Sequence, residues 1–484
     1  MRKSLWLTFT FLPTLTVCFS QTPEPPIARK KFAAKTVSNS IDSLTQLYDN
    51  YHPGFYRYTP KEEFTAYIDS VKHSLKDSLT AIEAFRVMKP LVAKVKCLHT
   101  NLELSKNYIT YLNKQPYLLP LQLYFKDGKA FVIKNFSGNK SVQPGDELIS
   151  INGRDIPSLQ RTLFDAIETD GNNETLKYLT LYYRFPEYYR NLIELTDTYQ
   201  LKAKRNGEEV AYNIKGRLYD SIATDWFLRP ANHPKKLEFA VKNNVGYLTL
   251  YAFDEPDVSN GGQNFKKFID KAFLELKTKK IPNLIIDMRN NGGGEDTYAE
   301  YLTSYLFDRP FRYWDHIECT PGEAAEIKKD KEALKYLRAP ILKDSIWIWQ
   351  KGIKTTEFDF IDEQQPAKNH YTGKVYMLIN GFCESSAADV PSILGYNKRV
   401  VLIGEETGGG YQGNNSGIIP DMKVKPMNFT ASLPLQKYFN AVDPNVSKDR
   451  GVFPDYEVPL TVEDLIAGRD KVMELVLQLI SSHS

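Results

Sequence analysis

The spacing of apolar positions divides the chain into three regions. Between residues 21 and 114, apolar side chains recur every three or four positions, as in Ile41, Leu44, Leu47 and Tyr48. This spacing places them on one face of an α-helix. The first region is therefore predicted to be a helical N-terminal domain over residues 21–114.

The second region, residues 115–216, consists of short segments typical of β-strands. Residues 117–125 and 130–136 flank a turn, and a Pro-Gly pair at 144–145 precedes a strand that ends at an Asn-Gly pair at 152–153. Such pairs favour tight turns between antiparallel strands. A tyrosine-rich segment between the later strands has helical character, so the predicted β domain contains a helical insertion.

Strands and helices alternate in the third region, residues 236–484. Apolar runs such as 284–288 and 375–379 are typical of buried strands, and amphipathic segments between the runs fit helices. This alternation predicts an α/β layer domain. Residues 217–235 are expected to link the β domain to it.

Residues 1–20 have the pattern of a secretory signal. Two basic residues open the segment, an apolar stretch follows, and small residues precede a cleavage position before Gln21. Lipidation of Cys18 is the weaker alternative, because Val17 is bulkier than a lipidation motif usually accepts. No other apolar stretch approaches the ~20 residues of a membrane-spanning helix. We expect an exported protein, periplasmic or at the cell surface or extracellular, that is membrane-associated only if lipidated.

Composition narrows the classes of partner. The net charge is only +3 and no long basic run occurs, so nucleic acid is not an expected partner. The seven histidines lack metal-ligand spacing, and neither a Walker loop nor a dinucleotide fingerprint is present, so no metal or cofactor is expected. Signal removal leaves three of the four cysteines, which predicts no disulfide scaffold. The oligomeric state stays open.

Two polar segments, each following an apolar run, carry the candidate chemistry. One reads Asn-Asn-Gly-Gly-Gly at 290–294, and the other Glu-Ser-Ser-Ala-Ala-Asp at 384–389. Glycines after a buried strand can turn backbone N–H groups toward a ligand. A serine in the turn before a helix can present its hydroxyl to a substrate. Together the segments predict an oxyanion hole and a nucleophile, and hence acyl transfer or peptide hydrolysis.

The order of these motifs resembles a known family. The stretch from Gly145-Asp146 to Asn152-Gly153 resembles the characteristic segment of PDZ domains. A helical region, a PDZ-like domain, Asp-x-Arg-x-Asn-Gly-Gly-Gly, Ser-Ala-Ala-acid and Gly-Glu-x-Thr-Gly together resemble the tail-specific, or C-terminal processing, serine peptidases. The resemblance implies a multidomain α/β protein whose catalytic core is a ClpP/crotonase-like α/β spiral.

The same resemblance implies a nucleophile and a base. Ser386 stands three residues before the acid Asp389, as the family nucleophile does, and Ser385 is the neighbouring competitor, which also suits a helix cap. One branch uses a lysine as base, but that position falls on Gly410. The tricorn-core-like branch uses a histidine in a His-Thr motif, which matches His99 here. A histidine of near-neutral pKa can take the serine proton and return it to the leaving amine.

The remaining site residues also come from the resemblance. Asp449, ahead of a Gly-Val-Phe-Pro-Asp element, is expected to orient the histidine, with Asp443 and Asp455 as alternatives. The oxyanion hole is expected from the backbone N–H of Gly292 or Gly293 together with that of Ala387.

Two functions follow from this reading. The first is a secreted serine endopeptidase acting on proteins or peptides through a serine nucleophile and a histidine base. The alternative is a catalytically inactive binding protein for peptides or hydrophobic ligands on the same scaffold, because the family fold also occurs in the interphotoreceptor retinoid-binding protein and fold alone does not decide activity.

Overall fold

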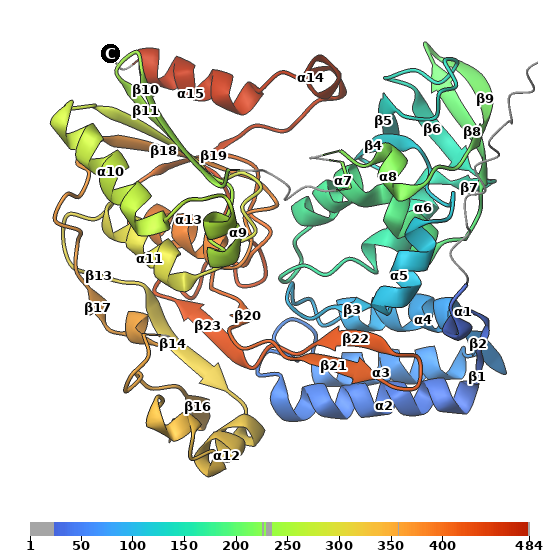
Figure 1. Ribbon diagram of the computed structural model, residues 1–484, viewed down its shortest axis with the longest axis horizontal. Helices are drawn as coiled ribbons and strands as arrows, with labels where there is room; N and C mark the ends of the chain where they lie inside the picture. Colours follow the sequence, from blue (N-terminus) through green and yellow to red (C-terminus); the bar gives the residue numbers. More distant parts are fainter. Residues whose placement is uncertain (1–23, 225–226, 229–234, 357, 483–484) are drawn as a thin grey trace, which may run out of the picture.

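The structure is a computed structural model that describes residues 24–224, 227–228, 235–356 and 358–482. The predicted signal segment and part of the predicted linker lie outside the described residues. The chain forms two halves that lie side by side in Figure 1, with the blue to green residues on one side and most of the yellow to red residues on the other. The halves meet where the candidate site lies.

The N-terminal region is helical, and its helices pack through the apolar faces that the sequence predicts. Val37, Ile41, Leu44 and Tyr48 of α2 are all buried. Its elements are α1 (Pro26–Arg29), β1 (Lys31–Ala33), α2 (Ala34–Tyr51), α3 (Lys61–His73), β2 (Ser78–Thr80), α4 (Ala81–Ala93), β3 (Leu102–Glu103) and α5 (Lys106–Asn113). The loop between α4 and β3 carries the candidate base.

The second region forms an antiparallel sheet with strand order β4-β5-β6-β8-β9 and β7 beside β6. Its elements are β4 (Leu121–Lys126), β5 (Lys129–Asn135), β6 (Glu147–Ile151), β7 (Arg154–Asp155), α6 (Ile156–Phe164), α7 (Thr175–Leu192), β8 (Thr198–Arg205), β9 (Glu208–Lys215) and α8 (Tyr219–Ile222). Helix α7 occupies the expected insertion and packs on β4, with the rings of Phe125 and Phe185 5.2 Å apart. The PDZ-like assignment stays a prediction.

The third region is built on a six-stranded sheet of order β10-β11-β12-β18-β19-β24. Strands β10 and β11 form an antiparallel hairpin, and the remaining neighbours are parallel. The strands are β10 (Leu237–Lys242), β11 (Val245–Leu250), β12 (Asn283–Asp287), β18 (Lys374–Ile379), β19 (Val401–Gly404) and β24 (Tyr456–Glu457). Both faces are covered, which is usual for parallel sheets because helical crossovers connect their strands.

Alternate side chains of the central strands enter different cores. Leu284 and Ile286 of β12 pack with α10 (Phe265–Thr278), α11 (Asp296–Ser304) and α13 (Ser386–Tyr396). Ile285 packs on the other face with α15 (Lys471–Ser482). This period of two is the geometry of a strand buried on both faces. The multidomain α/β fold expected from the sequence is confirmed, while the ClpP/crotonase-like spiral stays a prediction.

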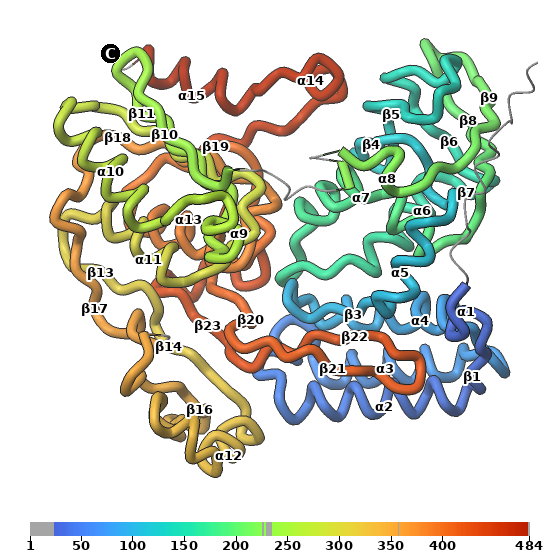
Figure 2. The backbone as a smooth tube through the Cα atoms, viewed as in Figure 1, coloured from blue at the N-terminus to red at the C-terminus, as the bar shows by residue number. Residues whose placement is uncertain are grey.

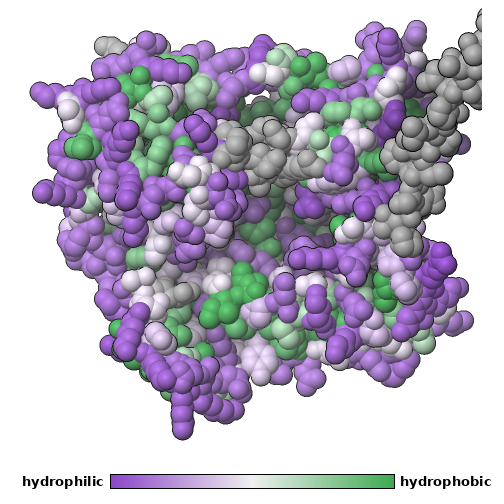
Figure 3. Space-filling view, in the orientation of Figure 1, coloured by the Kyte–Doolittle hydropathy of each residue, from purple (hydrophilic) through white to green (hydrophobic). Residues whose placement is uncertain are grey.

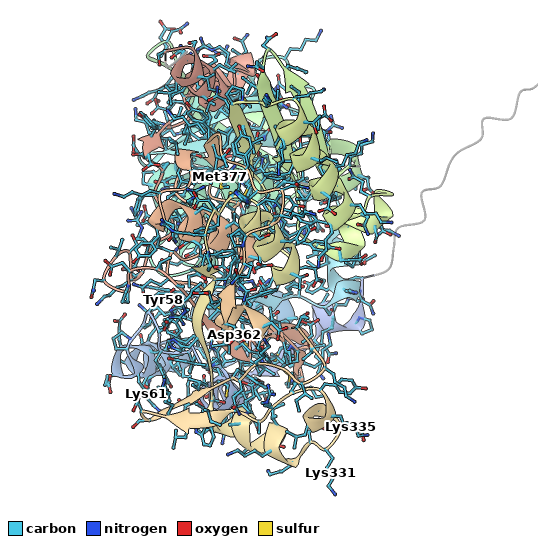
Figure 4. All side chains as sticks on the ribbon, turned by 90° about the vertical axis from the view of Figure 1, so that its left-hand side faces the viewer. Tyr58, Lys61, Lys331, Lys335, Asp362 and Met377 are labelled. Carbon is cyan, nitrogen blue, oxygen red and sulfur yellow. The ribbon has the colours of Figure 1, made fainter. Side chains whose placement is uncertain are left out.

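An arm extends from this half at the lower left of Figure 1. It includes strands β14 and β16 and helix α12, and Figure 4 shows Lys331 and Lys335 projecting from its tip, far from Met377 in the central sheet. The elements of the third region not yet given are α9 (Glu255–Asn260), β13 (Phe311–Arg312), β14 (Trp314–Cys319), α12 (Pro321–Lys329), η1 (Ala333–Lys335), β15 (Ile341–Lys343), β16 (Ile346–Ile348), η2 (Asp359–Ile361), β17 (Glu363–Gln364), β20 (Asn415–Ser416), β23 (Gln436–Asn440) and α14 (Val462–Ala467).

One hairpin of the third region joins the N-terminal region. Strands β21 (Asp421–Val424) and β22 (Phe429–Ser432) form a sheet with β3, in which Ala431 pairs with Leu102. Figure 2 shows this orange hairpin running beside the blue helices. Residues of this hairpin, such as Phe429 and Ala431, therefore share a hydrophobic core with the N-terminal region. No helix in the described ranges is long and apolar enough to cross a membrane.

Candidate active site

The two candidate segments meet at the carboxyl ends of β12 and β18, which are adjacent parallel strands. Asn290 donates its backbone N–H to the side-chain oxygen of Asn380 at 2.9 Å, and the Asn380 amide returns a bond to Asn290 at 3.0 Å. The N–H of Glu384 donates to the carbonyl of Asn291 at 3.2 Å. Open α/β sheets place their ligands at this edge, so the fold brings the glycine cluster and the serine turn together where a substrate can bind.

Ser385 occupies a strained turn immediately before helix α13. Its φ of 51° and ψ of −135° lie in a region that residues with a Cβ rarely adopt. The side chain is partly exposed and makes no capping hydrogen bond to the helix. A serine on a sharp strand-to-helix turn presents its hydroxyl outward as a nucleophile. The backbone at Ser385 therefore has the geometry expected of a nucleophile.

Ser386, the serine that the family motif favoured, lies in a different environment. It is fully buried, and its hydroxyl donates to the carbonyl oxygen of Gly294 at 3.2 Å. The turn at Ser385 places the next residue inside the first turn of the helix, where a substrate has less access. The structure thus favours Ser385, the competitor left open by the sequence, over Ser386.

The expected oxyanion donors are only partly available. The N–H of Ala387 donates to the carbonyl of Glu384 at 2.9 Å, and the N–H of Gly293 donates to Asn291 Oδ1 at 2.9 Å. In the described part of the chain, the N–H groups of Gly292 and Ser386 have no hydrogen-bond partner. Of the three expected donors only Gly292 keeps an open N–H, and the other open N–H belongs to Ser386, the residue after the strained serine, as in other nucleophile turns.

Glycine is required beside this turn. Gly293 has a φ of +90°, and a Cβ there would lie 2.8 Å from the Cβ of Ser385 and 2.8 Å from the carbonyl oxygen of Glu384. Such contacts are too short for any side chain to be accommodated without movement of the serine turn. The glycine cluster therefore lets the two loops approach each other, besides orienting N–H groups.

His99 lies on the loop after α4 and is partly buried, and its Nδ1 atom has no hydrogen-bond partner within the described residues. Burial lowers the pKa of His99 below its usual value of 6.5, while the charge of Asp170 and the carbonyl of Asn415 oppose that shift. A neutral imidazole near pH 7 can accept a proton. The ring therefore meets the electrostatic requirement for a general base.

The acid beside the histidine is Asp170, which the sequence analysis missed. It is buried, and its carboxylate accepts hydrogen bonds from the N–H of Leu98 at 3.0 Å and from that of Gly410 at 3.3 Å. Its charge favours a protonated His99, and burial raises the pKa of Asp170 itself. Gly410, at the position where the sequence motif of the other branch has its lysine, thus contacts this acid through its backbone N–H.

Tyr58 completes the surroundings of this acid. Its hydroxyl lies about 3.5 Å from the position of a Cβ on Gly410, and burial raises the pKa of Tyr58 above its usual value. Figure 4 shows Tyr58 where the helical region meets the rest of the molecule. The only sequence signal for Asp170 is its place in the polar run Glu-Thr-Asp-Gly-Asn-Asn at 168–173. Nothing in that run connects it to a histidine more than seventy positions away.

The other acids considered have different partners. Asp449 is exposed, and its carboxylate accepts a short hydrogen bond from the side chain of Asn172. Asp443 accepts a hydrogen bond from the N–H of Asn445 at 2.9 Å, and Asp455 accepts one from that of Leu402 at 2.8 Å. None of the three acids is among the groups that influence the His99 ring. Asp449 stays the acid expected from the sequence, whereas Asp170 is the acid whose charge acts on His99.

A cavity of about 340 Å³ joins the segments that carry the base and the nucleophile. Leu98, next to the histidine, and Glu384, next to the strained serine, both line it, as does Gly292. The face shown in Figure 3 is hollowed between the two halves of the molecule. No group of three or more potential metal ligands occurs among the residues described. The cavity thus lies beside the segments that carry the serine turn, the histidine and the two open N–H groups.

The sequence of the chain is similar to a family model and to proteins of known sequence. Residues 244–458 match the family model described as Peptidase family S41. An uncharacterized protein of Chlamydia muridarum is 27% identical over 290 residues, which are 50% of this chain and 46% of that protein. The tail-specific protease of Haemophilus influenzae is 21% identical over 206 residues, which are 42% of this chain and 24% of that protein. The matched part of the chain thus spans less than half the length of either relative.

Solved structures agree on the fold. The structure of mature CPAF complexed with lactacystin has a TM-score of 0.64 at 17% identity, covering 93% of this chain and 99% of that one. A crystal structure of mature CPAF gives the same TM-score and covers 98% of that chain. At this identity the likeness shows a shared fold. The match to the family model confirms the predicted peptidase domain over residues 244–458, and the roles of individual residues stay predictions.

Proposed function

The chain carries a serine peptidase domain of family S41 over residues 244–458, and we propose that it hydrolyses peptide bonds with Ser385 as nucleophile, His99 as base and Asp170 as the orienting acid. The observation that carries the proposal is the turn at Ser385. A strained, partly exposed serine lies beside two open N–H groups, at a cavity that the histidine loop also lines.

The proposed reaction has two halves. Ser385 Oγ attacks the scissile carbonyl carbon, and the His99 ring takes the hydroxyl proton. The oxyanion of the tetrahedral intermediate accepts hydrogen bonds from the N–H groups of Gly292 and Ser386. His99 then gives the proton to the leaving amine, the C–N bond breaks and an acyl-enzyme remains. Water, deprotonated by the same ring, hydrolyses that ester and restores the serine.

Substrates are proteins or peptides, as the family implies. The proposal includes export of the protein, because the basic and apolar residues that open the chain have the pattern of a signal. The proposal does not include specificity for protein tails, which the name of the relative from Haemophilus influenzae indicates for that protein. The sequence of the predicted PDZ-like domain has no obvious carboxylate-binding loop.

Labelling of the purified protein with a fluorophosphonate probe tests the proposal. The wild type is expected to be labelled, and Ser385→Ala and His99→Ala to lose labelling. Ser386→Ala keeps its backbone N–H and is expected to retain labelling, as is Ser259→Ala, an exposed serine that serves as the matched control. If Ser386→Ala lost labelling and Ser385→Ala kept it, the nucleophile would be Ser386, the residue favoured by the family motif. A folded but unlabelled wild type would support the binding-protein alternative.

A further inference from the structure

The cavity beside the serine turn has apolar walls. Leu98, Ile167, Leu176 and Phe382 contribute to its lining, and its volume is about 340 Å³. Pockets of a few hundred Å³ with apolar walls and few polar groups are typical ligand sites. The walls would hold the hydrocarbon part of a substrate side chain. The selectivity of the cavity among such side chains therefore depends on the charged groups that also line the cavity.

Most of these charged groups already have partners. Glu168, in the lining, forms a buried ion pair with Lys89. Arg184, also in the lining, pairs through Nε with Glu187 at 2.8 Å. Each pair joins one positive and one negative side chain. Neither pair therefore adds a net charge to the cavity.

Glu384 is the remaining charged residue of the lining. Within the described part of the chain its carboxyl group has neither a hydrogen bond nor an ion pair. Its Oε2 atom lies 4.0 Å from where a Cβ on Gly292 would stand, and its backbone continues directly into Ser385. An unpaired carboxyl group thus faces the cavity beside the proposed oxyanion donor and nucleophile.

We propose that this cavity receives a substrate side chain next to the scissile bond, and that Glu384 selects a basic one, lysine or arginine. The inference rests on the proposed function. Lysine and arginine carry a long apolar stem and a terminal charge, which matches apolar walls ending in a single unpaired carboxyl group. An acidic side chain brings no positive charge to stabilise the ionised form of Glu384, and it would repel that form.

The protonation of Glu384 responds to the charges around it. Burial raises the pKa of Glu384 to about 8, and the charge of Asp170 adds to the shift. Tyr188, which also lines the cavity, is influenced by the charge of Glu384 and by those of Arg184, Glu187 and Glu168. A cation within a few ångströms favours the ionised form of a carboxyl group. Binding of a basic side chain would therefore restore the charge that burial disfavours.

Peptide hydrolysis measures this selectivity directly. Internally quenched peptides carrying lysine, glutamine or glutamate are compared at each position flanking the cleaved bond. At one position the wild type is expected to show a kcat/KM at least about tenfold higher for lysine than for glutamine, as for other close interfacial charge pairs. Glu384→Gln is expected to bring that ratio close to one, whereas the exposed control Glu238→Gln keeps it.

A charge reversal gives a result that misfolding cannot produce. Glu384→Lys is expected to hydrolyse the glutamate peptide faster than the lysine peptide. Equal losses for all peptides in Glu384→Gln, with no reversal in Glu384→Lys, would assign the residue a purely structural role and overturn the inference. A wild type that the probe labels but that shows no lysine preference would overturn this inference alone. A wild type that is neither labelled nor active on any peptide would overturn the proposed function and this inference with it.

Discussion

At the scale of single residues, hydrogen-bond partners separate candidates that look alike in sequence. Ser385 and Ser386 are adjacent, yet one is partly exposed in a strained conformation and the other donates its buried hydroxyl to Gly294. Asp170 and Asp449 differ in the same way, because one is buried beside His99 and the other is exposed. Function at this scale depends on which polar atoms are left available to a substrate.

Replacement of the buried acid is the sharpest test at this scale. Asp170→Asn is expected to lower kcat by about 10⁴-fold, because an amide cannot stabilise the imidazolium or hold its tautomer as a carboxylate does. Asp449→Asn, at the exposed aspartate, is expected to change kcat far less. Both are measured on one quenched peptide at pH 7.5. A larger loss in Asp449→Asn would restore the acid expected from the sequence.

The ionisation of His99 is expected to set the pH dependence of kcat/KM. Its pKa is lowered by burial, so the neutral, proton-accepting form persists below the usual value of 6.5. Activity is therefore expected to be present above the folded pKa and to be lost as the pH falls through it, with the acid limb centred below pH 6.5. A limb centred well above 6.5 would contradict this assignment. Probe labelling across the same pH range should follow the same limb.

At the scale of elements, the site depends on how two loops leave adjacent strands. Strands β12 and β18 pair in parallel, so their following loops emerge side by side, and the Asn290–Asn380 bonds hold them together. The serine turn then fits against Gly293, where no side chain has room. The nucleophile geometry is thus a property of the loop pair.

Gly293→Ala tests this contact. The new Cβ would meet the serine turn at 2.8 Å and would force a φ of +90° on alanine, so kcat is expected to fall by about 10²-fold or more, as when an oxyanion donor is lost. Gly207→Ala is the matched control, since its φ is +87° and nothing lies within 4 Å of its Cβ. The control is expected to cost about 1 kcal/mol of unfolding free energy and to keep activity. Equal kcat in both variants would show that the contact has no catalytic consequence.

At the scale of the whole molecule, the proposed base, acid and nucleophile come from three separate regions. His99 follows α4, Asp170 lies between α6 and α7, and Ser385 precedes α13. The backbone N–H of Asn172 donates to the carbonyl of Asp449 at 2.7 Å, which fastens the acid-bearing loop to the third region. Asp449 therefore contributes through its backbone to the docking of these regions.

Docking can be disturbed without touching the reacting groups. A Cβ on Gly171 would lie 2.3 Å from the carbonyl oxygen of Asp449, at a φ of +64°. Gly171→Ala is expected to displace the loop that carries Asp170 and to reduce kcat at least tenfold while circular dichroism stays that of the wild type. Gly128→Ala, at a φ of +75° with nothing within 4 Å, is the control. Unchanged kcat in Gly171→Ala would show that this contact does not position the acid.

The sequence by itself determined the local features. The spacing of apolar residues predicted the helices and buried strands, and the glycine cluster and the serine turn marked the site, because each depends on neighbours within a few positions. The multidomain α/β fold and a peptidase domain over residues 244–458 are confirmed. The signal segment and the PDZ-like and tricorn-like details stay predictions.

Only the tertiary structure decided which of the similar residues face the site. The availability of an N–H group at Gly292 or Ser386 depends on hydrogen bonds within a folded loop pair. The assignment of Asp170 depends on a contact between loops far apart along the chain. Burial and hydrogen bonding between distant segments set these roles, and neither follows from the spacing of residues because spacing reports only local geometry.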